Sequence, residues 1–213
     1  MNENLTMDNN SPRVCILDYG SGNVNSVYNI LKYMKHSVVI SNDDENIKMS
    51  THIILPGVGS FGSAINKINN LLPIKLLEKE VFGKRKPFLG ICVGMQVLAS
   101  IGYENSRCKG LGWIDGVVKK IDSKKYSLPH IGWQGLEVKK ESPITMNISG
   151  LDFYFVHSYA LFPNNDDYLA ATTTYGEEFC SIIMKENIYG MQFHPEKSQQ
   201  AGMQIIKNFL NLK

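Results

Sequence analysis

The sequence contains no long hydrophobic run. Of its 213 residues 43% are hydrophobic, yet no stretch of about 18 consecutive apolar residues occurs, so we predict no membrane-spanning helix and no membrane partner. Residues 1–12 are rich in asparagine and lack the basic and apolar segments of a signal peptide. We expect residues 1–12 to form a loosely ordered tail and residues 13–213 to form a single globular domain.

The net charge is small and cysteine is rare. Twenty-two basic and 20 acidic residues give a net charge of +2, which argues against nucleic acid or an anionic membrane as a partner. The four cysteines, at positions 15, 92, 108 and 180, include no Cys-x-x-Cys pair and no spacing typical of a metal site. We therefore expect no disulfide framework, no metal or other cofactor, and a reducing, cytoplasmic location.

Apolar segments that alternate with helical patterns fill the first half of the chain. The expected strands are 13–18, 38–40, 52–55 and the apolar segment before Cys92, and the expected helices follow the first strand to about residue 33, the third strand to about residue 68, and residues 73–82. Residues 42–50 are expected to be a polar connection. Continuous apolar strands joined by helices are typical of a parallel sheet covered on both faces.

After Gly102 the pattern changes to strands separated by turns. The expected strands are 113–121, 135–139, 153–156, 169–174, 180–184 and 189–193, followed by a helix over 198–212. The predicted fold is therefore α/β, with a mostly parallel central sheet, helices on both faces, and an additional mixed or antiparallel sheet in the C-terminal half.

The segment Gly90-Ile91-Cys92-Val93-Gly94 has the pattern of a nucleophile elbow, with cysteine in place of serine. The two glycines leave room where a Cβ would collide with the bent backbone. A helix that begins at Val93 would favour the thiolate of Cys92 over the thiol. The alternative is a buried structural cysteine, a common place for a free thiol.

A thiol nucleophile needs a base and a group that orients the base. Among five histidines, His194 stands out in the segment Phe193-His194-Pro195-Glu196. Pro195 ends the preceding strand, and residues two apart in extended backbone share a face, so Glu196 can bond one nitrogen of His194 and leave the other for Cys92. The alternative is an ordinary surface turn.

Two glycine-rich loops could supply backbone donors. The N–H of Val93 and the loop at Val58 are the candidates for an oxyanion hole. The same loop contains Gly57-x-Gly59-x-x-Gly62, which matches a dinucleotide fingerprint, but it is not in the first strand–helix unit and lacks the expected acidic residue. The loop 19–23, Tyr-Gly-Ser-Gly-Asn, fits either a phosphate cradle or a tight turn.

These segments together resemble the class I (triad) glutamine amidotransferases, and within them the glutaminase subunits of imidazole glycerol phosphate synthase. The resemblance covers nearly all of the chain from Val14, and the segments that carry it are 18–23, 55–62, 90–96, 129–133, 154–159 and 192–198. It implies a class I glutamine amidotransferase fold, with Cys92 attacking the side-chain amide of glutamine, His194 as acid and base, and Glu196 orienting His194.

The resemblance also implies the binding residues and the partner. It assigns substrate binding to Gly59, Gln96, His157, Ser158 and Tyr159, and the oxyanion donors to Val58 and Val93, with Val58 reorienting before it donates. It further implies that ammonia passes to a separate (β/α)₈-barrel synthase subunit, which faces Trp133, Tyr154 and Lys197, and that histidine biosynthesis is the pathway served.

One residue departs from the family pattern. Gln134 follows Trp133 where the family usually has asparagine. Because this segment borders the partner, a second possibility is a paralogous glutaminase that supplies a different synthase, such as a sugar-modifying amidotransferase. A third is a binding module without catalytic activity, which would be expected to lack the cysteine or the histidine.

Overall fold

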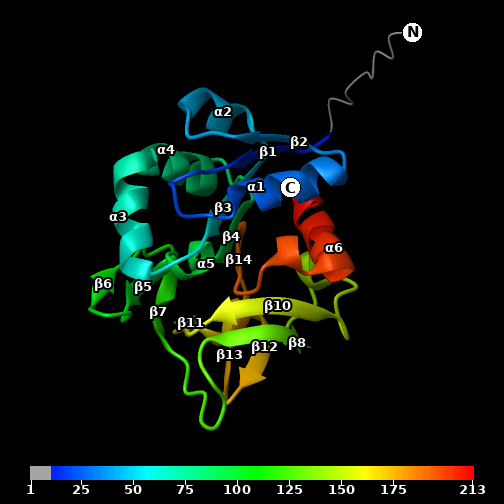
Figure 1. Ribbon diagram of the computed structural model, residues 1–213. Helices are drawn as coiled ribbons and strands as arrows, with labels where there is room; N and C mark the ends of the chain where they lie inside the picture. Colours follow the sequence, from blue (N-terminus) through cyan, green and yellow to red (C-terminus); the bar gives the residue numbers. More distant parts are fainter. Residues whose placement is uncertain (1–10) are drawn as a thin grey trace.

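An eight-stranded sheet runs through the protein in the computed structural model, which describes residues 11–213 (Figure 1). The expected tail at residues 1–12 therefore lies almost wholly outside the described residues. The strand order is β2-β1-β3-β4-β14-β13-β12-β9. The five strands of the parallel part are β2 (Ser37–Ile40), β1 (Arg13–Ile16), β3 (His52–Gly57), β4 (Phe88–Cys92) and β14 (Ile188–Met191). The antiparallel extension is β13 (Glu177–Lys185), β12 (Leu169–Tyr175) and β9 (Glu137–Val138).

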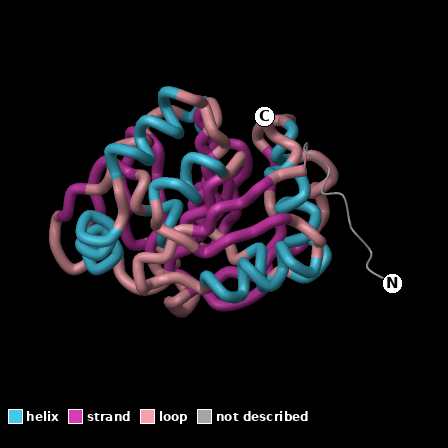
Figure 2. Tube along the Cα trace, turned by 90° about the horizontal axis from the view of Figure 1, so that it is seen from above, coloured by secondary structure: helices cyan, strands magenta, loops and turns pink. Residues whose placement is uncertain are grey.

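Helices lie on both sides of this sheet (Figure 2). They are α1 (Val24–Tyr33), α2 (Asp44–Met49), α3 (Phe61–Leu71), α4 (Ile74–Glu78), α5 (Val93–Gln96) and α6 (Gln199–Leu210). The polar connection predicted over residues 42–50 contains a helix that was not predicted, α2, which buries Ile47 and whose carbonyls at Ile47 and Lys48 accept from Lys86. No helix within residues 11–213 has the length and apolar character needed to cross a membrane.

Two smaller sheets complete the C-terminal half. One pairs β10 (Asp152–His157) with β8 (His130–Gly135), and the other has the order β11-β7-β5-β6. Its strands are β11 (Tyr159–Pro163), β7 (Ile114–Lys120), β5 (Ala99–Gly102) and β6 (Cys108–Lys109). The predicted strand 135–139 is present only as the short β9, and Gly135 instead ends β8, which was not predicted as a strand. The predicted fold class is confirmed.

The buried side chains form one cluster that spans both halves of the chain. Helices α1, α3 and α6 each bury one apolar face against the sheet, for example Val27 and Leu31 of α1 and Ile205 and Phe209 of α6. The parallel strands β3 and β4 at the centre of the sheet are buried on both faces, which explains why their sequences are continuous apolar runs.

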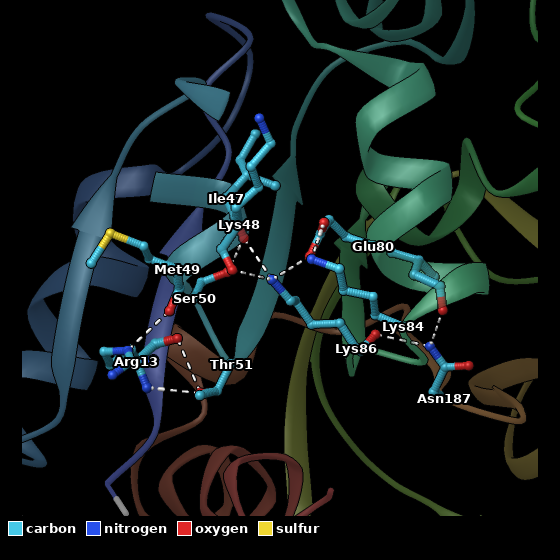
Figure 3. Close-up of polar contacts among 11 residues, drawn as sticks. Arg13, Ile47, Lys48, Met49, Ser50, Thr51, Glu80, Lys84, Lys86 and Asn187 are labelled. Carbon is cyan, nitrogen blue, oxygen red and sulfur yellow. Dashed lines mark hydrogen bonds and ion pairs between the residues drawn. The ribbon is translucent and has the colours of Figure 1, made fainter. Parts of the chain in front are cut away.

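Strands β4 and β14 are tied together where they begin, by Asn187 and Lys86 (Figure 3). The Asn187 side-chain amide donates to the carbonyls of Val81 and Lys86, and the backbone carbonyl of Asn187 accepts the N–H of Phe88. The buried Lys86 ammonium lies 2.9 Å from Glu80 and 2.6 Å from the carbonyl of Ile47. These contacts fix the register of β4 beside β14, and both strands lead to the opposite edge of the sheet.

Candidate active site

Cys92 lies at the end of β4, where the backbone turns sharply into α5. Its φ of 54° falls in the left-handed region, which is uncommon for any residue other than glycine. A Cβ at Gly94 would overlap the carbonyl of Leu55, and a Cβ at Gly90 would overlap the carbonyl of Gly94. The strand–turn–helix geometry expected of a nucleophile elbow is therefore present, although α5 is only four residues long.

His194 is held in place by contacts of its backbone and its ring. Its N–H donates to the carbonyl of Tyr154, and its carbonyl accepts the hydroxyl of Ser198. Its Nδ1 lies 2.8 Å from Oε1 of Glu196. The expected contact is present, but the expected cause was wrong: β14 ends at Met191, and Pro195–Lys197 form a 3₁₀ turn that brings Glu196 back under the ring.

The imidazole of His194 is strongly biased toward its protonated form. Burial by itself lowers its pKa, but the neighbouring Cys92 sulfur and the Glu196 carboxylate outweigh burial and raise the pKa of His194 to about 10. Its buried Nε2 has no hydrogen-bond partner among residues 11–213 that satisfies ordinary geometry. This second nitrogen is therefore available to exchange a proton with the nearby Cys92 sulfur, which also raises the pKa of His194.

A cavity of about 400 Å³ opens above the elbow. It is lined by Val58, Gly59, Cys92, Val93, Gln96, Glu104, Pro129, Val156, His157, Ser158, Tyr159 and His194. The structure thus brings together nine of the residues singled out in the sequence as nucleophile, base, oxyanion donors or substrate contacts. Glu196 lies behind His194, and the three expected interface residues lie outside the cavity lining.

The backbone N–H of Val58 does not point into the cavity. It donates to the carbonyl of Ser21 at 2.9 Å. The loop that provides this carbonyl is in turn held by Lys67 of α3, whose ammonium donates to the carbonyl of Gly20 and the hydroxyl of Ser21. This agrees with the expectation that Val58 must reorient before it can serve a developing oxyanion.

The carbonyl of Tyr159 is already occupied within the protein. It accepts Nε2 of Gln96 at 2.7 Å and Nδ1 of His157 at 2.9 Å. The other nitrogen of His157 lies 3.3 Å from Nδ1 of His130, which fixes the tautomer of both rings. Burial lowers the pKa of His157 to about 3 and that of His130 to about 4, so both rings are neutral.

Two polar residues of the site were missed in the sequence. Glu104 supplies the only carboxylate among the lining residues, and it also accepts the N–H of Phe61 at 2.7 Å. Asn23 donates to Oε1 of Glu196 at 3.2 Å across 173 positions of sequence. Neither residue has a local motif of its own, and the signal that pointed near Asn23 was the unexplained glycine loop 19–23.

The glycines of the dinucleotide-like pattern have another explanation. A Cβ on Gly57 would come within 2.5 Å of both the Tyr19 hydroxyl and the backbone nitrogen of Gly94. Gly57 therefore allows the β3 loop to pack against the elbow. Among residues 11–213 no group of three or more histidine, cysteine or acidic side chains is arranged to hold a metal ion.

The three expected interface residues form a surface cluster. Trp133 of β8 is 46% exposed and meets Tyr154 of β10 edge-on at 5.8 Å. The ammonium of Lys197 lies over the Tyr154 ring at 5.8 Å. Strand β8 exposes Ile131 as well as Trp133, so its surface is apolar next to the loop that carries His194.

The sequence matches the family model of glutamine amidotransferase class-I over residues 15–212. This range contains the elbow, the His194–Glu196 pair and the whole cavity lining. The chain therefore belongs to the class-I glutamine amidotransferase family.

Its curated relatives narrow the family. The chain is 46% identical over 208 residues to imidazole glycerol phosphate synthase subunit HisH of Pelagibacter ubique, covering 93% of this chain and 99% of that protein. It is 40% identical over 203 residues to the chloroplastic imidazole glycerol phosphate synthase hisHF of Arabidopsis thaliana, covering 94% of this chain and 34% of that protein. Within the class the chain belongs to the HisH family.

Solved structures support the fold. The structure of PurLQS from Thermotoga maritima matches with a TM-score of 0.72 at 20% identity, covering 94% of this chain and 98% of that chain. At this identity the likeness concerns only the arrangement of the elements.

Proposed function

We propose that this chain is the glutaminase subunit of an imidazole glycerol phosphate synthase, with residues 13–213 acting as one glutaminase domain. The observation that carries the proposal is the shared cavity: Cys92, on a strained elbow, and His194, bonded through Nδ1 to Glu196, both line it. The high identity to HisH proteins over nearly the whole chain supports the same assignment.

The proposed reaction begins with attack of the Cys92 sulfur on the side-chain amide carbon of glutamine. The imidazolium of His194 gives its proton to the departing ammonia, and a γ-glutamyl thioester remains. His194 then takes a proton from water, the resulting hydroxide attacks the thioester, and glutamate leaves as the thiol is restored. Glu196 keeps the ring oriented and stabilises its charged form.

The cavity offers complementary groups for a free amino acid. Glu104 is suited to the α-ammonium of glutamine, because it is the sole acidic lining residue. Gln96 uses its amide nitrogen inside the protein, which leaves its oxygen as an acceptor. Gly59 and the segment 157–159 border the same space. The N–H groups of Val93 and, once it leaves Ser21, of Val58 would hold the oxyanion.

The proposed partner is a (β/α)₈-barrel synthase subunit that uses the ammonia to form imidazole glycerol phosphate and AICAR. The hisHF relative supports a physical link between two parts, since this chain spans only 34% of that protein. The cluster of Trp133, Tyr154 and Lys197 would face the barrel. Aromatic side chains at such a surface are typical anchors of protein interfaces.

The test is glutamine hydrolysis by the isolated chain, with and without the histidine-pathway barrel subunit and its ligand. We expect little activity alone, a large increase in the complex, and none for Cys92→Ala although the complex still forms. Wild-type rates for Cys92→Ala would refute the assigned nucleophile. Stimulation by a sugar-modifying synthase, and not by the histidine-pathway barrel, would identify the paralogous glutaminase instead.

A further inference from the structure

Gln192 is a fully buried polar residue that the proposed reaction leaves without a role. It lies just after β14 and two residues before His194, and its backbone N–H donates to the carbonyl of Ser181. Its side chain extends toward the elbow at Cys92. There its Nε2 lies 3.8 Å from the sulfur of Cys92, and its Oε1 lies 3.1 Å from Nε2 of Gln96.

The orientation of this amide follows from the neighbouring carbonyl. The oxygen of Tyr159 can only accept, so the Gln96 atom that lies 2.7 Å from it must be the amide nitrogen. The same nitrogen contacts Gln192, so the Gln192 atom facing it must be an oxygen. The opposite end of the Gln192 amide is then its NH₂ group, which faces Cys92.

We propose that Gln192 donates a hydrogen bond to the Cys92 sulfur and thereby stabilises the thiolate that the reaction requires. Hydrogen bonds to the charged form of a group favour that form, and they are stronger where water is excluded. Because the amide touches the reacting atom, Gln192 is a catalytic residue in this proposal. The inference rests on the proposed function for the use of the thiolate, whereas the contact itself does not depend on it.

Other titratable groups also lie near Cys92 and must be considered in any test of Gln192. His194 faces the sulfur from the turn after β14. Tyr19 is buried beside the elbow, where burial raises the pKa of its phenol and the nearby Cys92 raises that pKa further. His157 and Glu104 line the same cavity, and Glu196 acts through His194. The effect of Gln192 must therefore be read as a difference between variants that keep all of these neighbours.

The test is the rate at which iodoacetamide alkylates Cys92 in the full chain as the pH is raised. Mass spectrometry of the peptide that contains Cys92 separates it from the other three cysteines. In Gln192→Leu we expect the pH midpoint of alkylation to rise by about one unit, roughly tenfold less thiolate at a given pH. In Gln192→Glu, which can still accept from Gln96, a carboxylate faces the sulfur and the midpoint should rise further.

The matched control is Gln204→Leu on α6, which removes an amide bonded to Asn208; neither residue lines the cavity. A purely structural role for Gln192 would lower the melting temperature and leave the midpoint unchanged, and that result would overturn the proposal. If Gln192→Leu does not fold, an unchanged midpoint in Gln192→Glu overturns it equally. Since alkylation needs no glutamine, the outcome is independent of the Cys92→Ala test of the proposed function.

Discussion

The His194–Glu196 pair depends on a third, uncharged side chain from the other end of the chain. Asn23 follows the glycine loop after β1 and donates to the same carboxylate oxygen that bonds His194. The hydroxyl of Ser26 donates to the Asn23 oxygen and so orients its amide. Glu196 is buried, and its Oε2 has no hydrogen-bond partner within residues 11–213, so each contact of Oε1 weighs more.

We therefore predict that Asn23→Ala lowers kcat for glutamine hydrolysis in the complex by roughly tenfold, because one donor to a buried charged acceptor is lost. KM should change less, since Asn23 does not line the cavity. The control is Asn164→Ala, which removes an amide bonded to Asp115 on the exposed surface. An equal fall in both variants would contradict a role at Glu196.

A second prediction concerns the neutral histidine pair. The folded-state pKa of His130, about 4, lies below its ordinary value of 6.5, so the unfolded chain binds a proton there as the pH falls below 6.5 and the folded chain does not. Its contribution to stability is present above pH 6.5 and is lost toward pH 4. Between pH 7.5 and 5.5, urea unfolding should show a loss about 1 kcal/mol smaller for His130→Phe than for the wild type. Equal losses would show that His130 does not titrate on unfolding.

Sequence reasoning could find Cys92, His194 and Glu196 because each lies in a short segment whose glycine or proline constrains the backbone. It could not find Asn23, Glu104 or the role of Gln192. Their partners lie 173, 43 and 100 positions away, so only the folded sheet brings them together.

At the scale of elements, α3 and the loop after β1 together hold the loop that carries Val58. Lys67 holds the loop whose carbonyl, at Ser21, binds the N–H of Val58. The proposed reaction needs that N–H inside the cavity. In the proposed reaction, the contact with Lys67 would therefore stabilise the inactive arrangement of Val58.

We predict that Lys67→Met increases glutamine hydrolysis by the isolated chain by roughly threefold to tenfold, because removal of one charged donor lowers the cost of releasing Val58. The measurement is glutamate release without the barrel subunit. Lys207→Met on α6 provides the control. A decrease, or no change, in the Lys67 variant would show that this lysine does not hold the loop in its inactive form.

The errors in predicted elements have a common cause. Helix α2 and strands β5, β6 and β11 lack a strong periodic pattern. Strand β6 pairs with its close neighbour β5, and the other three elements have contacts distant in sequence, such as the pairing of β11 with β7. Strand β8 begins in a segment that carries Pro129 and Gly132, residues that argue against a strand. By contrast, the parallel strands β3, β4 and β14 could be predicted because burial on both faces requires continuous apolar sequences.

At the scale of the whole molecule, the apolar surface of β8 lies outside the cavity, next to the loop that carries His194. We predict that Trp133→Ala weakens binding of the barrel subunit by about tenfold or more, as expected for a large aromatic anchor. Titration of one subunit with the other would measure this change. Hydrolysis at saturating partner should remain, and Tyr33→Ala, which removes a side chain that is 77% exposed on α1, should leave binding unchanged. Unaltered affinity in the Trp133 variant would place the interface elsewhere.

The contacts at Asn187 and Lys86 are relevant to how a protein of this kind can come to serve a different synthase. They join β4 to β14 where the two strands begin, at the end of the strands opposite the cavity. Because Cys92 and His194 follow the other ends of these strands, the contacts help to fix the spacing of the sulfur and the imidazole. Replacements around the rim of the cavity, including in strand β8 with Gln134, can then remodel the docking surface while the reacting pair keeps its alignment. A single hydrolytic unit can in this way be fitted to different synthases.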